Sequence, residues 1–337
     1  MLYSFKRQSG TLAAVVILLA LLASACGNSE PAAQSSSAPA SQAASTASGQ
    51  ADDGATVVYR DALDREVTIP AHPQRILTTQ YLPEMLAVGV KPIGVVSHLL
   101  TGFVSVKDQI GGIEDIGPAN DPNLEKMLDM QPDLIIATDW DKDNLDKLEK
   151  IAPTVFVGWE GRDAFQHLND VAAVLGKTKE AADWTAKFNE KAAVAAEQLK
   201  SSVGPEETFG VVVIGGYEKG QLRVYGPGNV GYVLYDALHF SMTDTVKREW
   251  DKGGHELGIQ LSLEKLPEFA SADRLFLVRF DNDPDFDQQV LNSALWKSLP
   301  AVKNGKVYEV DNNLWFSYDV MSFSAQLDDA VALLSNK

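Results

Sequence analysis

The fold can be read from Pro122-Asn123-Leu124-Glu125-Lys126-Met127-Leu128-Asp129-Met130-Gln131-Pro132-Asp133-Leu134-Ile135-Ile136-Ala137. Asn123 can cap a short helix, and Glu125 falls in its first turn, where the helix dipole favours an anion. After Pro132-Asp133 comes an unbroken apolar run of the kind that forms a buried strand. The stretch therefore predicts a short capped helix that leads directly into a strand.

The second half of the chain repeats this plan. The letters LSLEKL at 261–266 lead through Ala272-Asp273 into the apolar run 275–278, with a serine in the capping position. Leu-Glu-Lys is a common helical tripeptide, and capping alone could explain both carboxylates. The matched strand after each copy, at nearly equal spacing, adds information. It predicts two pseudo-symmetric lobes, each with a surface glutamate, Glu125 and Glu264.

Short apolar runs alternate with helical stretches in both halves, which is typical of a parallel sheet with helices on its faces. We expect strands over 75–77, 93–96, 134–137, 155–157, 209–214, 274–280 and 306–310. We expect helices over 83–88, 144–151 and 320–334, and a hairpin that pairs 57–59 with 67–69.

A long helical region from Ala164 to about Ser202, with a break at Gly176-Lys177, interrupts the alternation. The simplest architecture that fits is an α/β fold of two Rossmann-like lobes joined by a single long helix, with a ligand cleft between the lobes. We place the N-terminal lobe at 56–165, the connecting helical region at 166–203 and the C-terminal lobe at 204–337.

The first 25 residues have the features of a secretory signal peptide. Lys6-Arg7 supplies the positive start, and residues 12–25 form an apolar run that ends in small residues and is short for a membrane span. Cys26 follows at once, and Leu22-Ala23-Ser24-Ala25-Cys26 resembles a bacterial lipobox, whose cysteine carries lipid and becomes the mature N-terminus. The three residues before the cysteine also suit an ordinary signal peptidase. Simple secretion therefore stays open beside lipidation, which we favour.

Residues 26–55 are rich in Ser, Ala and Gln and cannot bury a core, so we expect a disordered linker. Cys26 is the only cysteine, which makes an intramolecular disulfide impossible. The net charge of -17 argues against nucleic acid or an anionic membrane surface as a partner. A local arginine pocket could still bind an anionic ligand.

The mature chain resembles the substrate-binding lipoproteins of bacterial ABC importers for ferric siderophores, in the helix-linked class that also includes cobalamin binders. The resemblance rests on Arg75-Ile76-Leu77, Leu86-Ala87-Val88-Gly89-Val90-Lys91-Pro92-Ile93-Gly94-Val95, Ile116-Gly117, the block 123–137, Ala294-Leu295-Trp296 and Gly305-Lys306-Val307-Tyr308. It implies a monomeric binding protein without enzymatic activity, anchored by lipid on the outer face of the cytoplasmic membrane. In that family one glutamate on each lobe docks with a permease subunit, and the matching positions are Glu125 and Glu264.

The carboxyl ends of strands supply the candidate ligand contacts, because open α/β sheets bind ligands there. The residues that follow the apolar runs are aromatic and basic: Tyr81, Trp140, Trp159, Arg162, Arg223, Tyr225, Arg279, Trp315, Phe316 and Tyr318. A tryptophan is more often a core residue than a ligand contact, and any one arginine could lie on the surface. As a set at strand ends they predict a cleft lined by aromatic faces and guanidinium donors.

This chemistry suits a ferric siderophore, whose own oxygens saturate the iron, so that the protein needs no metal ligand or cofactor. Arginines can donate to the chelating oxygens while aromatic faces cover the organic scaffold. The resemblance maps the cleft aromatics of ferric-hydroxamate binders onto Trp140 and Trp315. The segment Ser97-His98-Leu99-Leu100-Thr101 lacks the lysines expected of catecholate binders. We therefore favour hydroxamate or mixed citrate-hydroxamate ligands.

Other functions remain open at this point. Haem or cobalamin would fit the same fold, with Tyr81 or His98 as an axial ligand to haem iron. A surface sensor would bind the ligand without importing it. A direct zinc or manganese site is disfavoured because the five histidines show no ligand spacing, and an enzyme because no G-x-S-x-G, HExxH or P-loop motif occurs. A long helical connector also predicts modest closure around a largely preformed cleft.

Overall fold

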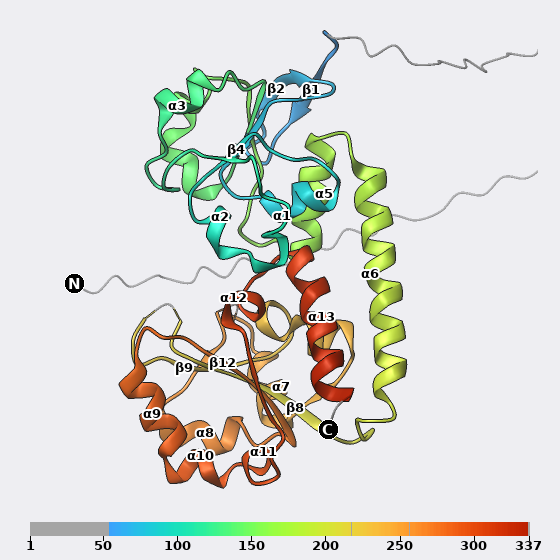
Figure 1. Ribbon diagram of the computed structural model, residues 1–337, viewed down its shortest axis with the longest axis vertical. Coiled ribbons are helices and arrows are strands. Elements are labelled where there is room, and N and C mark those ends of the chain that lie inside the picture. Colours follow the sequence, from blue (N-terminus) through green and yellow to red (C-terminus); the bar gives the residue numbers. More distant parts are fainter. Residues whose placement is uncertain (1–53, 217, 256, 336–337) are drawn as a thin grey trace, which may run out of the picture. The chain divides into compact units, whose positions relative to one another are not determined.

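Two central β-sheets, one in each half of the chain, organise the structure (Figure 1). The computed structural model describes residues 54–216, 218–255 and 257–335. The predicted signal peptide, Cys26 and all but the last two residues of the predicted linker lie outside the described residues. Within the described part, the sequence expectation of an α/β fold with two lobes is confirmed.

The first sheet has five parallel strands in the order β5-β4-β3-β6-β7. They are β3 (Ile76–Thr78), β4 (Gly94–Val95), β5 (Glu114–Asp115), β6 (Leu134–Ala137) and β7 (Thr154–Phe156). Four of them lie where apolar runs predicted strands, whereas the two acidic residues of β5 gave no such signal. The predicted hairpin is confirmed, with β1 (Thr56–Arg60) antiparallel to β2 (Glu66–Pro70).

Short helices connect these strands. They are α1 (Leu82–Ala87), α2 (Leu99–Gly102), η1 (Val104–Val106), α3 (Leu124–Asp129), η2 (Asp139–Asn144) and α4 (Leu145–Leu148). The helix expected over 144–151 ends early at Leu148. The nearby Pro153 disfavours helical backbone in the residue before it, and the chain turns into β7 instead.

The second sheet is mixed, with the order β11-β9-β8-β12-β13 and β10 paired with β8. Its strands are β8 (Thr208–Ile214), β9 (Leu222–Tyr225), β10 (Ser241–Met242), β11 (Ile259–Gln260), β12 (Arg274–Arg279) and β13 (Val307–Val310). Strands β9 and β11 are antiparallel to their neighbours, so the prediction of a parallel sheet was wrong for this part of the second lobe. The seven residues 215–221 that separate β8 from β9 are too few for a parallel crossover but enough for a hairpin.

The helical elements of the second lobe are mostly short. They are η3 (Asn229–Gly231), the π-helical turn η4 (Val233–Ala237), α7 (Asp244–Trp250), η5 (Leu263–Lys265), α8 (Leu266–Phe269), α9 (Pro284–Asn292), α10 (Ala294–Ser298), α11 (Pro300–Lys303) and α12 (Asn312–Trp315). The final helix, α13 (Val320–Ser335), lies where the amphipathic pattern predicted it.

The predicted long helical region consists of α5 (Ala164–Val174) and α6 (Thr178–Leu199). The break is where the sequence placed it, at Gly176, whose φ of +66° is left-handed backbone that glycine adopts without strain. Helix α6 has 22 residues, about 33 Å of rise, and it runs alongside both lobes in Figure 1. It packs on α5 and on α13.

One face of each sheet contributes to the same hydrophobic cluster. Alternate residues of β6, Leu134 and Ile136, belong to the same buried cluster as Val211 of β8 and Phe276 of β12. Helices α5, α6 and α13 contribute many further residues to that cluster. The outer face of each sheet has a separate core of its own. A movement of the lobes that pulled these two faces apart would expose the shared core to water. This supports our prediction that closure around a ligand is modest.

The repeated sequence motif forms the same contact in both lobes. Asp133, just before β6, accepts hydrogen bonds from the N–H groups of Gln74 (2.7 Å) and Arg75 (2.9 Å), just before β3. Asp273, just before β12, accepts from the N–H and hydroxyl of Thr208 at the start of β8 (both 2.8 Å). Each aspartate thus ties two adjacent parallel strands at their amino ends, as pseudo-symmetric lobes require.

The caps of the two motif helices differ. The Asn123 side chain accepts from the N–H of Lys126 at 2.9 Å, so the predicted cap of α3 is confirmed. Ser262 makes no such cap on η5, and that prediction was wrong. Its hydroxyl instead hydrogen-bonds to the carboxylate of Glu264, which with the Glu264 N–H lowers the pKa of that carboxyl.

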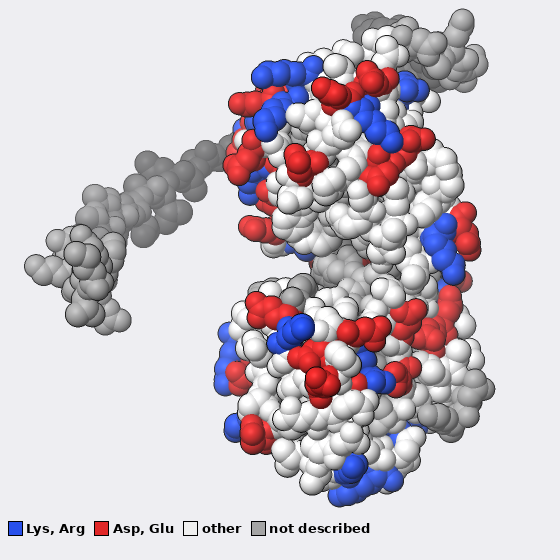
Figure 2. Space-filling view, turned by 60° about the vertical axis from the view of Figure 1, so that its left-hand side comes forward, with Lys and Arg blue, Asp and Glu red and all other residues white. Residues whose placement is uncertain are grey.

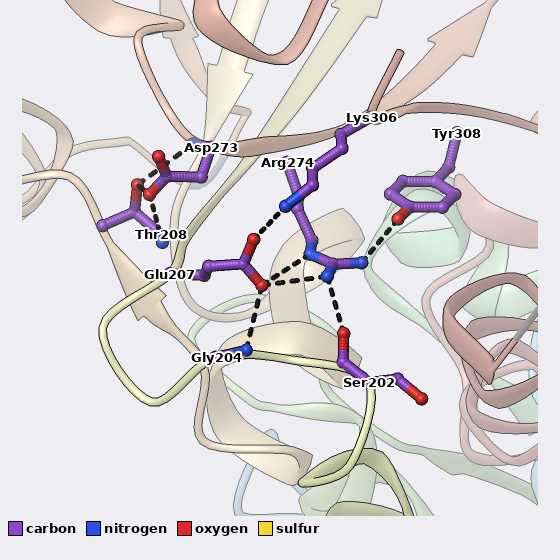
Figure 3. A network of polar contacts seen from close by, with 8 residues as sticks. All are labelled: Ser202, Gly204, Glu207, Thr208, Asp273, Arg274, Lys306 and Tyr308. Carbon is purple, nitrogen blue, oxygen red and sulfur yellow. Dashed lines mark hydrogen bonds and ion pairs between the residues drawn. The ribbon is translucent and has the colours of Figure 1, made fainter. Parts of the chain in front are cut away.

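A polar network holds the second lobe to the end of the connecting helix (Figure 3). Glu207 accepts from the Arg274 guanidinium (2.9 and 3.0 Å), from Lys306 and from the N–H of Gly204 (3.0 Å). Arg274 also donates to the Tyr308 hydroxyl and the Ser202 carbonyl, both at 2.7 Å. Burial would raise the pKa of Glu207, but these donors outweigh it and lower the pKa to about 2.

Candidate ligand-binding cleft

A cleft of about 1060 Å³ lies between the lobes and is lined by residues of both. Figure 2 shows a hollow there, with mainly uncharged side chains above it and both acidic and basic side chains below it. The first lobe contributes Gln80, His98, Gly102, Phe103, Trp159, Glu160, Gly161, Arg162, Asp163 and Gln166. The second contributes Pro227, Gly228, Asn229, Trp250, Gly253, Gly254, His255, Leu257, Phe316, Ser317 and Tyr318. The size is that of a small-molecule site.

The loop after β7 forms much of the first wall. The carboxylate of Asp139 accepts from the N–H groups of Trp159 (2.5 Å) and Glu160 (3.3 Å), and it pairs with Lys142 at 2.6 Å. Burial would raise the pKa of Asp139, but the Lys142 ammonium and the two N–H donors outweigh it, so the pKa lies below the usual value. Asp139 therefore stays ionised and binds the loop from beneath.

The indole of Trp159 rests on a buried histidine. The His167 ring is stacked on it with centroids 4.2 Å apart and an interplanar angle of 22°. His167 Nε2 donates to the Trp159 carbonyl at 3.1 Å. Burial lowers the pKa of His167, so the ring is neutral at physiological pH. Trp159 thus has fixed partners on its inner side, while the cleft lies at its outer side.

The facing wall follows α12. Tyr318 contacts Trp159 edge to face, at 6.4 Å between ring centroids, so aromatic residues of the two lobes meet in the cleft lining. Phe316 packs edge to face on Phe280 at 4.9 Å and presents the rest of its ring to the cleft. Trp250, at the end of α7, completes this aromatic wall.

Among the described residues of the cleft lining, carboxylates outnumber arginine and lysine side chains. Arg162 pairs with Asp170 at 2.5 Å, and its side chain is 39% exposed. Glu160 is exposed, and Asp163 accepts from the N–H groups of Phe165 and Gln166 as the cap of α5. The lining therefore offers one guanidinium that already has a carboxylate beside it.

The structure brings four of the predicted ligand contacts together: Trp159, Arg162, Phe316 and Tyr318 all line the cleft. Trp140 lies next to them, 6.2 Å from Trp159 between ring centroids, and its Nε1 donates to Gln80 at 3.3 Å. Its side chain is 47% exposed, which is a large fraction for an indole. We keep Trp140 as a candidate contact.

Three other predicted aromatic contacts belong to the core. Tyr81 is fully buried, and its hydroxyl donates to the Val157 carbonyl at 2.8 Å. Trp315 is fully buried, and its Nε1 donates to Asp329 at 2.7 Å. Tyr225 in β9 is fully buried as well. These side chains have no surface to offer a ligand, so we correct their assignment from ligand contacts to core residues.

Two predicted arginines also do not line the cleft. Arg279 is held by Asp287 (2.6 and 2.9 Å) and Glu309 (2.7 Å), and the hydrogen bonds to Asp287 raise its pKa. It ties the end of β12 to α9 and β13 rather than serving a ligand. Arg223, in β9, is 5% exposed and is absent from the lining. The structure therefore places neither arginine among the residues that line this cleft.

Several lining residues were missed from the sequence, among them Phe103 and Trp250. Phe103 follows a four-residue helix, and Trp250 ends a helix, so neither follows an apolar run. His98 lines the cleft, and burial lowers its pKa. Tyr81 can no longer serve as an axial ligand, because its hydroxyl is buried.

Among the described residues, no group of three or more His, Cys, Asp and Glu side chains is arranged to hold a metal ion. In that same part of the chain, no helix combines the length and apolar character needed to cross a membrane.

The fold and the cleft define a class: two-lobed α/β binding proteins with one helical connector. The chain belongs to the Periplasmic binding protein family, whose sequence model matches residues 76–314. The family is one of binding proteins, so the expectation that the chain is not an enzyme is borne out.

Curated relatives cover most of the chain. The iron(3+)-hydroxamate-binding protein YxeB of Bacillus subtilis (strain 168) is 33% identical over 273 residues, 78% of this chain and 80% of the relative. The iron(3+)-hydroxamate-binding protein FhuD of the same strain is 31% identical over 335 residues, 97% of this chain and 98% of the relative. The probable siderophore-binding lipoprotein YfiY of that strain is 28% identical over 312 residues, 89% of this chain and 90% of the relative.

Solved structures share the fold. A FhuD-fold periplasmic binding protein component of a ferrichrome ABC transporter from Bacillus subtilis has a TM-score of 0.73 and 31% identity, covering 83% of this chain and 100% of that chain. Staphylococcus aureus SirA complexed with staphyloferrin B has a TM-score of 0.69 and 28% identity, covering 83% of this chain and 99% of that chain. The predicted family resemblance is therefore confirmed.

Proposed function

We propose that the protein is the extracytoplasmic substrate-binding component of an ABC importer that captures a ferric siderophore and delivers it to a permease. The cleft carries this proposal. It is large enough for such a ligand, has aromatic walls on both sides, and its described lining residues include no set of metal ligands. Iron must then arrive already chelated, with the protein covering the organic scaffold. The names of the relatives support the same ligand class.

Within that class we favour hydroxamate siderophores. Three hydroxamates each give one negative charge and neutralise Fe(III), whereas three catecholates leave a strongly anionic complex. Burying such an anion needs cationic partners. The lining offers Arg162, which already pairs with Asp170, and it includes the acidic Glu160 and Asp163. A neutral or weakly charged complex suits this balance best.

Tryptophan fluorescence tests the ligand class. Ferric complexes of hydroxamate, citrate-hydroxamate and catecholate siderophores are titrated into the protein, with haem and cobalamin in parallel. We expect quenching by the hydroxamate complexes, since Trp159 and Trp250 line the cleft and Trp140 lies beside it. Trp159→Phe should reduce the quenching. A response to haem alone, with an intense Soret band, would replace the proposal with haem binding.

We further propose that Glu125 and Glu264 dock the two lobes on the two permease subunits. Both side chains are exposed, and both lie in the first turn of a short helix. Docking charges of this kind orient a complex more than they hold it. The double variant Glu125→Ala/Glu264→Ala should bind ligand normally and lose most uptake. Unchanged uptake in the double variant would sink the docking assignment.

Lipid attachment at Cys26 is the proposed anchor, and the lipoprotein relative supports it. The linker would then serve as a tether on the outer face of the cytoplasmic membrane. Intact mass of the mature protein tests this directly. A diacylglyceryl mass on Cys26 is expected, and a free thiol would indicate plain secretion.

A further inference from the structure

We propose that Asp139 and His167 are positioning residues that hold Trp159 as a rigid, preformed wall of the cleft. The inference rests on the proposed function for its ligand, but its geometric part concerns Trp159 alone. Neither side chain lines the cleft, so neither is a ligand contact. Both lie behind the loop after β7, which does line the cleft.

Asp139 fixes the backbone of the loop. One carboxylate oxygen accepts from two successive N–H groups, those of Trp159 and Glu160. Lys142 pairs with the other oxygen at 2.6 Å, which holds the carboxylate in place. A loop at the end of a strand has few other backbone partners, so this double contact determines where Trp159 leaves the sheet.

His167 fixes the side chain. It comes from α5, is fully buried, and presents its flat face to the indole at 4.2 Å. Its donation to the Trp159 carbonyl selects the tautomer with the proton on Nε2. Beneath it lies the buried Tyr81, whose ring centroid is 5.7 Å from that of His167 and 6.0 Å from that of Trp159. Tyr81 thus supports the wall, although it does not contact ligand.

The consequence for binding is preorganisation. Immobilising a large side chain at the moment of binding has an entropic cost, and a ring that is fixed beforehand avoids it. A ligand that lies on Trp159 would therefore gain affinity from residues that it never touches. Loss of either support should weaken binding on the order of 2- to 10-fold.

NMR relaxation of the Trp159 indole N–H measures rigidity without any ligand. The resonance is assigned by its disappearance in Trp159→Phe. We expect an order parameter of about 0.85 in the unmodified protein and below about 0.6 in His167→Ala and Asp139→Ala. His167→Phe keeps the stacked face and should stay near the unmodified value.

Asp133→Ala is the matched control. Asp133 also accepts from two successive N–H groups, but at the amino ends of β6 and β3, on the edge of the sheet away from the cleft. It should cost stability as Asp139→Ala does, yet leave the Trp159 order parameter and the affinity unchanged. If Asp139→Ala does not fold, the experiment uses Asp139→Asn instead, because asparagine keeps one acceptor oxygen.

The affinity arm uses the ferric complex of desferrioxamine B as the probe. A rise in Kd for His167→Ala, with partial recovery in His167→Phe, supports the proposal. An unchanged order parameter in both alanine variants, or an equal loss in Asp133→Ala, would overturn it. If no variant and not even the unmodified protein binds any siderophore, the proposed function fails while the relaxation data still decide the positioning role.

Discussion

The amino ends of the two central sheets are joined by the same aspartate contact, but the nearby arginines that reinforce them have different partners. In both lobes an aspartate, Asp133 or Asp273, binds the N–H groups that open the neighbouring strand. In the first lobe the nearby Arg75 is exposed and donates to the carbonyls of Gln131 and Met130. In the second lobe Arg274 is buried with Glu207. The two lobes therefore share a topology but stabilise these strand ends differently. The first lobe uses hydrogen bonds to backbone carbonyls, and the second uses a buried ion pair.

Removing each arginine tests this contrast most strongly. Arg274→Ala should lower the free energy of unfolding by about 3–5 kcal/mol, because it leaves Glu207 short of its main partner and the Tyr308 hydroxyl without its donor. Arg75→Ala should cost less than about 1 kcal/mol, since its carbonyl partners can turn to water. Urea unfolding monitored by circular dichroism measures both. Equal losses would mean that the lobes do not differ in this way.

Acid should reveal the same difference. The pKa of Glu207 is about 2 in the folded state against an ordinary value of 4.5. A lowered folded pKa contributes stability that is fully present above pH 4.5 and is lost as the pH falls toward 2, on the order of 3 kcal/mol. In Glu207→Gln this part of the acid dependence should disappear. An identical slope of stability against pH between 4.5 and 2 in both proteins contradicts the assignment.

The smallest expected contrast is between the two motif caps. Asn123→Ala should cost about 1 kcal/mol, because the N–H of Lys126 loses its acceptor. Ser262→Ala should change stability little, since its side chain makes no cap on η5. Thermal unfolding of the two variants provides the comparison. A larger loss in Ser262→Ala would show that its bond to Glu264 matters more than the cap.

The fold was largely predictable because its strands are continuous apolar runs. The strand at Leu134–Ala137 and the break before Thr178 fall where the sequence placed them. The strand Leu222–Tyr225 was not predicted. Its antiparallel direction was not predictable from residue type alone, because pairing direction also depends on the length of the connection to the preceding strand. The two-residue strands carry no periodicity at all.

The cleft was less predictable, because a polar group on an aromatic side chain can be satisfied internally. The hydroxyl of Tyr81 bonds to Val157, a residue 76 positions away, and nothing local in the sequence signals that contact. Trp159 and Tyr318 have exposed edges because they lie on loops at the rim of the sheets. Position after a strand therefore indicates where a cleft lies but does not separate its lining from its support.

Helix α13 gives the chain an order of assembly. It comprises residues 320–335, yet it packs on α1 of the first lobe and contributes Phe323 and Leu327 to the shared core. During synthesis the first lobe thus lacks part of its packing until the second lobe has been made.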